Sequence, residues 1–238
     1  MGKETVLIVG AAGDVGQGIV AAALVSGRNV VAAGRDAERL EVLAARHSGE
    51  PIACVAGNLA SEAGAALLWD RAVAAFGGVD AVVISVNAPN RVEKLAAWNA
   101  ADIAATLEAN VLTHFIAAKT FLPRLPESGM LIGIGGGTAD FIFPGMAPMS
   151  MAQAALRMLY RGLAKERKNG AQLRELMIVS MVAGASNRET AQGDWVTDAE
   201  VGRHVCAILG APELFPKPIL HLRSRAQAGH PELEGAAA

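Results

Sequence analysis

Short apolar runs alternate with helix-like segments along nearly the whole of this 238-residue chain. The runs are apolar at every position rather than at every second one, which indicates strands that are buried on both faces. Strands of this kind, each followed by a helix, are typical of a parallel sheet with helices on both sides. The sequence therefore predicts a doubly wound, Rossmann-like α/β fold of about seven strands with helices on both faces. The expected strands are Val6–Val9, Asn29–Ala33, Ile52–Val55, Ala81–Val86, Met130–Ile134, Leu176–Val182 and Ile219–Leu222.

The expected helices lie between these strands. A capping box, Thr197-Asp198-Ala199-Glu200, marks the start of the last one, because the Thr hydroxyl and the Glu carboxylate can each accept a free backbone N–H. We expect a single domain over residues 1–225 and a frayed tail over residues 226–238. The expected helices are one through Ile19–Leu24, then Asp36–Ala45, Ser61–Phe76, Ala101–Leu122, Ser150–Lys168 and Thr197–Leu209.

The charge and composition exclude several classes of partner. The 21 basic and 23 acidic residues are scattered and give a net charge of −2, so no nucleic acid is expected as a partner. No apolar run approaches the roughly 20 residues that span a bilayer, and the start of the chain does not have the pattern of a signal peptide. Two cysteines are too few for the disulfide framework of a secreted protein. We therefore expect a cytoplasmic protein with a small-molecule substrate, no membrane partner and no metal site.

A glycine-rich turn follows the first expected strand. Gly10, Gly13 and Gly16 are spaced three residues apart and lead directly into the first helix. Glycines let a backbone approach a pyrophosphate closely, and the N–H groups at the start of the helix stabilise the phosphate charge. This turn predicts a dinucleotide site, with Asp14 capping the helix through its side chain. The residues expected at the pyrophosphate are Gly10, Ala12, Gly13, Asp14, Val15 and Gly16.

The turn and several later motifs resemble the short-chain dehydrogenase/reductase family, from about Glu4 to Leu222. Gly10-Ala11-Ala12-Gly13-Asp14-Val15-Gly16 is similar to the Gly-x-x-Gly-x-x-Gly form of extended and atypical members, although the main subfamily has a glycine where Asp14 stands. The resemblance implies a nicotinamide cofactor. It also implies that Asn58 and Leu59 flank the adenine, that Val86 and Asn87 lie beside the cofactor, and that Asn110 supports the catalytic group on the next helix.

Gly34 and Arg35 follow the second expected strand, where an NAD-specific member of the family would carry an acidic residue for the ribose 2′-hydroxyl. No carboxylate is present there to repel a 2′-phosphate, and a guanidinium can bind that phosphate with two hydrogen bonds. We therefore expect NADP(H) as the cofactor, bound in part by Arg35. The alternative is that Arg35 is an ordinary solvated surface side chain.

The catalytic positions of the family carry the wrong residues. Active members use a Ser, a Tyr thirteen residues later, and a Lys four residues after the Tyr. Alignment places Gly136, Met149 and Gln153 at these positions with the same spacing. Tyr160 lies about 16 Å further along its helix, and His114 is expected at a packing or subunit surface. Thr138 and Asp140 are the nearest other polar groups, so no catalytic residue is assigned, and Gln153 is expected to contact the cofactor.

The sequence thus leaves two functions open. One is an atypical NADP(H)-dependent oxidoreductase acting on a small substrate, in which the proton comes from water or from the substrate. The other is a non-catalytic NADP(H)-binding sensor or an assembly subunit. The family resemblance also implies a homodimer or homotetramer formed through helices near Ala104 to Leu122.

Overall fold

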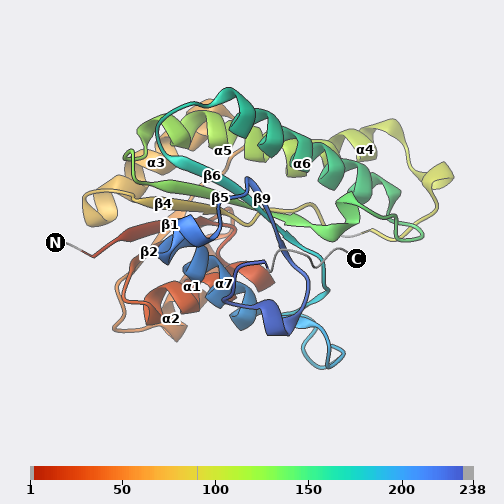
Figure 1. Cartoon of the computed structure of the whole chain (residues 1–238). Coiled ribbons are helices and arrows are strands. Elements are labelled where there is room, and N and C mark those ends of the chain that lie inside the picture. The colour runs from red at the N-terminus through yellow and green to blue at the C-terminus, as the bar shows by residue number, and fades with distance from the viewer. Residues whose placement is uncertain (1–2, 90, 233–238) are drawn as a thin grey trace.

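A single parallel sheet organises the computed structural model, which describes residues 3–89 and 91–232. Its seven strands lie in the order β3-β2-β1-β4-β5-β6-β9, which confirms the predicted doubly wound fold (Figure 1). A separate pair of two-residue strands follows β6. The sheet strands are β1 (Thr5–Val9), β2 (Asn29–Gly34), β3 (Ile52–Ala56), β4 (Ala81–Ile84), β5 (Met130–Gly136), β6 (Gln172–Ile178) and β9 (Ile219–Leu222), and the small pair is β7 (Val182–Ala183) and β8 (Val196–Thr197).

Helices cover both faces of the sheet. Figure 1 shows α1, α2 and α7 on one face and α3, α4, α5 and α6 on the other. Within β1, Val6 and Ile8 pack into the core shared with α1, α2 and α7. Leu7 and Val9 pack into the core on the other face, shared with α3, α5 and α6. This is why the strand is apolar at every position. The helices are α1 (Asp14–Val25), α2 (Ala37–Arg46), α3 (Glu62–Phe76), α4 (Ala100–Leu107), α5 (Thr113–Phe121), α6 (Ala147–Glu166) and α7 (Asp198–Gly210).

Several expected bounds shift by a few residues, and two expected elements differ most from the structure. The helix predicted over Ala101–Leu122 is divided by a π-helical turn, Glu108–Leu112, in which the Thr113 N–H donates to the carbonyl of Glu108. The sixth strand begins at Gln172 instead of Leu176 and ends at Ile178 instead of Val182. Two charged residues inside β6, Arg174 and Glu175, interrupt the apolar run, so the sequence pattern does not indicate that the strand begins before them.

The first residues of the tail contact the rest of the domain. Residues 225–227 form a 3₁₀ turn, and Ala228 is only 4% exposed. The backbone N–H of Gly229 donates to Nδ1 of His204 at 3.1 Å. Part of the tail that is expected to fray, residues 226–232, thus has partners on α7 and β9. Residues 233–238 lie outside the described residues.

Helices α1 and α7 pack backbone against backbone. A Cβ placed on Gly18 would lie 2.0 Å from the carbonyl oxygen of Asp198. A Cβ placed on Gly202 would lie 2.1 Å from the carbonyl oxygen of Gly18. Only glycine fits at such a distance, since real Cβ atoms do not approach backbone oxygens this closely. The close contact also brings the starts of the two helices side by side.

The strand order fixes where a ligand can bind. The chain runs from β1 outward to β2 and β3, then returns to β4 on the other side of β1. In such sheets the ligand crevice lies at the carboxyl ends of the strands, where this reversal occurs. That edge, called the carboxyl edge below, carries the glycine-rich turn.

No helix among residues 3–89 and 91–232 is both long and apolar enough to cross a membrane.

Candidate cofactor and active site

The glycine-rich turn is pressed closely against the end of β4. Gly10 has a φ of +84°, and a Cβ there would lie 2.1 Å from the carbonyl oxygen of Ser85. A Cβ on Gly16 would lie 2.1 Å from the carbonyl oxygen of Gly10. The N–H of Gly10 donates to the carbonyl of Ala33 in β2 at 2.9 Å. These contacts explain why the turn requires glycine and how it is fixed at the carboxyl edge.

Helix α1 starts at this turn without a side-chain cap. Gly13 is the N-cap residue, and no side chain accepts from the first-turn N–H groups. The prediction that Asp14 caps the helix is therefore wrong. Its Oδ1 instead accepts the backbone N–H of Ser186 at 3.0 Å, and its Oδ2 accepts the Ser186 hydroxyl. The start of α1 thus presents backbone N–H donors and the positive end of the helix dipole to the carboxyl edge.

Two arginines stand at the end of β2. Arg35 is exposed and, within the described part of the chain, makes no side-chain hydrogen bond. Arg39, on the first turn of α2, donates from Nη2 to the carbonyl of Ala12 at 2.6 Å. Arg39 was missed in the sequence, although a basic residue in the first turn of the helix expected from Asp36 was an available signal. Arg39 therefore contacts the glycine-rich turn, and Arg35 follows the strand whose Ala33 carbonyl holds that turn.

Gln153 lies at the centre of the predicted catalytic position. Its side chain is buried, and Oε1 accepts the N–H of Gly136 at 2.8 Å. Its Nε2 donates to Oδ1 of Asn87 at 3.3 Å and to Oδ1 of Asn110 at 3.2 Å. The amide therefore joins the ends of β4 and β5 to the π-helical turn. Met149 is also adjacent, since its sulfur lies 3.8 Å from Nε2.

The structure brings Gly136, Met149 and Gln153 together, as their spacing predicts. A Cβ on Gly136 would lie 3.7 Å from the Gln153 amide and 3.7 Å from Oγ1 of Thr138. None of the three side chains carries an ionisable group. Asp140 is turned away, because its carboxylate pairs with Arg157. At this point the structure offers a buried amide and a hydroxyl.

The other predicted residues lie along the same edge. Oδ1 of Asn58 accepts the N–H of Ala60 at 3.1 Å, which fixes the loop after β3, and Leu59 is buried beneath it. The Val86 carbonyl accepts from Nε2 of His114 at 3.2 Å. Asn58 and Leu59 follow β3, on one side of β1 and its glycine-rich turn. Asn87 and Gln153 lie on the other side, at the ends of β4 and β5.

A buried polar pair lies behind the amide network. His114 is fully buried, and its Nδ1 lies 3.0 Å from the hydroxyl of Tyr160. Because the Val86 carbonyl can only accept, Nε2 of His114 carries the proton and Nδ1 accepts from Tyr160. Burial lowers the pKa of His114 to about 4 and raises the pKa of Tyr160 well above its usual value. His114 thus lies inside the protein rather than at a subunit surface.

Glu175 is a buried acid beside this pair. It is 0% exposed, and among the described residues neither carboxyl oxygen has a hydrogen-bond partner. Gly135 makes room for it, since a Cβ there would lie 2.3 Å from Oε1 of Glu175. Burial raises the pKa of Glu175 to about 8, with a further rise from Asp140 and a partial reduction from Arg157. The group is therefore largely neutral at pH 7.

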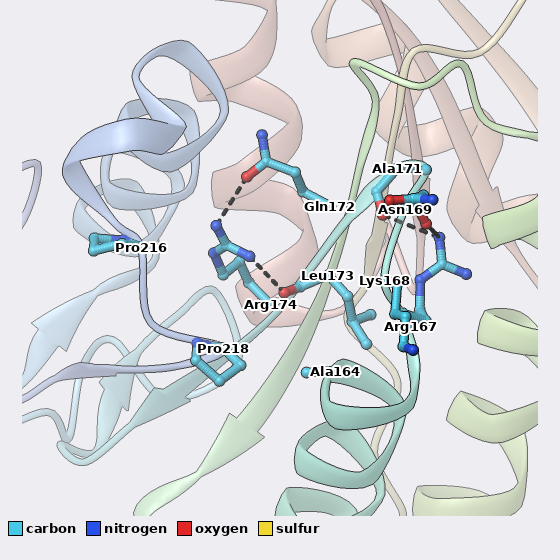
Figure 2. Close-up of a pocket in the computed structure, with 11 residues that line it drawn as sticks. Ala164, Arg167, Lys168, Asn169, Ala171, Gln172, Leu173, Arg174, Pro216 and Pro218 are labelled. Carbon is cyan, nitrogen blue, oxygen red and sulfur yellow. Dashed lines mark hydrogen bonds between the residues drawn. The ribbon is translucent and has the colours of Figure 1, made fainter.

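A depression lies at the edge of the sheet opposite the carboxyl edge, where β6 begins (Figure 2). Arginines line it, but their donors serve the protein itself. Arg174 donates from Nε to the carbonyl of Phe215 at 2.9 Å and from Nη2 to Oε1 of Gln172 at 2.8 Å. Arg167 donates to the carbonyl of Ala171 at 3.1 Å. These bonds connect strand ends, so these arginine donors are already engaged with protein acceptors.

Comparison with known proteins agrees with this geometry. Solved structures share the fold at low sequence identity. A short-chain dehydrogenase/reductase (glucose/ribitol dehydrogenase) from Brucella melitensis is 21% identical, with a TM-score of 0.81 over 92% of this chain and 94% of that one. An alcohol dehydrogenase from the archaeon Thermococcus sibiricus, complexed with 5-hydroxy-NADP, is 20% identical, with a TM-score of 0.80 over 94% and 97%.

A third structure, a short chain dehydrogenase/reductase from Burkholderia phymatum in complex with NAD, is 17% identical, with a TM-score of 0.76 over 87% of this chain and 86% of that one. No curated protein matches the sequence. The family model described as short chain dehydrogenase matches residues 4–187, which is most of the chain. The protein therefore belongs to the short-chain dehydrogenase/reductase family.

Proposed function

We propose that the protein binds NADP(H) at the carboxyl edge. The observation that carries this proposal is the uncapped start of α1 behind a turn that only glycine can form, with Arg35 and Arg39 at the adjoining end of β2. The N–H groups of α1 suit a pyrophosphate, and the guanidinium groups suit a 2′-phosphate. The residues present therefore fit the cofactor. Asn58 and Leu59 would border the adenine, and Val86 and Asn87 would border the nicotinamide half.

We further propose an oxidoreductase of atypical mechanism. A bound nicotinamide supplies a hydride to the substrate or accepts one from it. The Gln153 amide holds the N–H of Gly136, Asn87 and Asn110 in place, and this ordering shapes the position where a substrate would lie. None of the side chains of Gly136, Met149 and Gln153 is ionisable, so the proton comes from water or from the substrate. Such chemistry suits a small conjugated alkene or quinone better than a simple ketone.

NADPH is expected to bind at least tenfold more tightly than NADH, because Arg35 can form charge-assisted hydrogen bonds to the 2′-phosphate. The Arg35→Ala variant should lose most of this difference while its affinity for NADH stays within about twofold. Isothermal titration calorimetry of both cofactors with the parent and the variant measures this. Equal affinities for the two cofactors in the parent protein would contradict the assignment of NADP(H).

The second candidate is a non-catalytic NADP(H)-binding sensor or assembly subunit. The observation that favours it is the Gln153 amide, whose oxygen and nitrogen are both engaged with protein groups and which cannot supply a charge. A screen for NADPH oxidation with conjugated alkenes and quinones distinguishes the two functions. Tight cofactor binding without turnover of any acceptor would favour the sensor.

The triple substitution Gly136→Ser, Met149→Tyr and Gln153→Lys is expected to produce NADPH-dependent reduction of a simple ketone. The new hydroxyl at position 136 fits, because its Cβ would have no heavy atom closer than 3.7 Å. A positioned proton donor raises rates on the order of 10²-fold or more, and the new Tyr needs the adjacent ammonium to lower its pKa. Each single variant, assayed in parallel, should stay at the parent's background. Robust ketone turnover by the parent itself would overturn the proposed loss of the catalytic groups.

We also propose that the protein self-associates through the helices near Ala104 to Leu122. Leu112 and Phe115 on this stretch are 50% and 38% exposed, and a second copy related by a twofold axis would cover them. Light scattering at micromolar concentration tests this, and a monomer would contradict it.

A further inference from the structure

The start of α1 is bonded to a segment far away in the sequence. Asp14, the first residue of the helix, accepts both the N–H and the hydroxyl of Ser186, which is 172 residues distant. The contact is close as well as polar, since a Cβ on Gly184 would lie 2.3 Å from the Cβ of Asp14. The segment that follows β7 is thereby held directly over the start of α1.

The same segment has a second attachment on the neighbouring helix. Arg188 donates to both carboxylate oxygens of Asp198, at 3.2 Å each, and Asp198 is the first residue of α7. Within the segment, Oδ1 of Asn187 accepts the N–H of Gly184 at 2.9 Å. The segment from residue 184 to residue 190 is therefore fixed by two aspartates, one at the start of each of two adjacent helices.

The two aspartates differ in their surroundings. Asp198 forms an ion pair with Arg188, whereas the partners of the Asp14 carboxylate in the described structure are the neutral donors of Ser186. No basic side chain of the described structure pairs with Asp14, so its carboxylate has no ion-pair partner at the end of α1 that lacks a side-chain cap. A pyrophosphate at those N–H groups would bring further negative charge to the same place, and like charges at short range oppose one another.

We propose that Asp14 limits the affinity of this protein for dinucleotides, because its carboxylate and the cofactor pyrophosphate compete for the start of α1 while Asp14 holds the segment after β7 in place. The inference rests on the proposed NADP(H) site. It assigns Asp14 a role opposite to that of a helix cap that merely stabilises α1. A purely structural Asp14 would leave cofactor affinity unchanged when its charge is removed.

The test is the Asp14→Asn variant, which removes the charge and keeps an oxygen for the N–H of Ser186. Calorimetry with NADPH is expected to show about tenfold tighter binding than in the parent, which corresponds to about 1.4 kcal/mol. Adenosine 2′-monophosphate, which carries the 2′-phosphate but no pyrophosphate, is the second probe. Its affinity should change by less than about twofold, because Arg35 and Arg39 are untouched.

Asp198→Asn is the matched control. It makes the same chemical change at the start of α7 and weakens the attachment of Arg188, but it leaves the charge on α1 in place. Its affinity for NADPH should stay within about twofold of the parent. Hydrogen exchange supplies a readout independent of ligands: Asp14→Ala, which removes both bonds to Ser186, should accelerate exchange of the Ser186 amide.

The outcomes separate this inference from the proposed function. NADPH binding that is unchanged or weaker in Asp14→Asn overturns the competition and leaves the NADP(H) site intact. An equal gain in Asp198→Asn also overturns it, because loosening of the segment would then explain the effect. If neither probe binds to the parent or to any variant, the NADP(H) site itself is wrong and the role of Asp14 falls with it.

Discussion

The Gly202→Ala variant is expected to lose about 3 kcal/mol of unfolding free energy, a large effect for the addition of one methyl group. Its new Cβ would lie 2.1 Å from the carbonyl oxygen of Gly18 and 2.9 Å from the Cβ of Ala22. Helix α7 cannot move aside without cost, because Val201, Val205 and Ile208 are fully buried in the core beneath it. Urea denaturation of the parent and the variant measures the difference.

Gly162→Ala is the matched control for this experiment. Gly162 lies inside helix α6, and a Cβ there would meet nothing within 4 Å. The same substitution should therefore stabilise the protein by about 0.5–1 kcal/mol, through helix propensity alone. If Gly202→Ala behaved like Gly162→Ala, the close approach of α1 and α7 would be refuted.

The second large effect concerns the pH dependence of stability through Glu175. Its pKa is about 8 in the folded protein, against an ordinary value of 4.5, because burial disfavours the carboxylate. The native state thus holds a proton that the unfolded chain releases above pH 4.5. The stabilising effect of this proton is complete below about pH 4.5 and is lost as the pH rises through about 8.

Glu175→Gln imitates the neutral acid at every pH. The unfolding free energy of the variant should equal that of the parent at about pH 4.5. The difference should grow in favour of the variant by on the order of 4 kcal/mol by about pH 8. His114 and His204, whose pKa values burial lowers to about 4, destabilise both proteins in acid. Their effects cancel in the difference. Urea unfolding at several pH values measures it, and a difference independent of pH would show that Glu175 is ionised in the native state.

The fold was largely predictable because the strands of a sheet buried on both faces must be apolar throughout. The prediction failed at β6 for the same reason. Arg174 and Glu175 look incompatible with a buried strand, but the guanidinium of Arg174 bonds to backbone carbonyls and Glu175 is largely uncharged. The bond from Arg174 to Phe215, 41 positions away, and the burial that raises the pKa of Glu175 both depend on residues that are remote in the sequence and have no local signature.

The candidate site likewise has features that the local sequence predicts and one contact that it does not. The glycine-rich turn and the spacing of residues 136, 149 and 153 are local features, and the structure places them where the sequence predicts. The bond from Asp14 to Ser186 could not be predicted, because it joins residues on different elements 172 positions apart. The local alternative, a helix cap, is the common role of an aspartate at such a position. Here the carboxylate accepts from Ser186 instead.

The π-helical turn Glu108–Leu112 determines how one helical stretch faces the sheet. Thr106, Asn110 and His114 recur every four residues, and in a regular α-helix each would drift about 40° around the axis from the one before. The wider turn removes part of this drift, so all three are buried in one row. These three polar side chains lie on the inner face of a mostly apolar helical stretch. Asn110 accepts from the Gln153 amide, and His114 donates to the Val86 carbonyl. The phase of the helix, set by one irregular turn, is what brings these groups to the same edge.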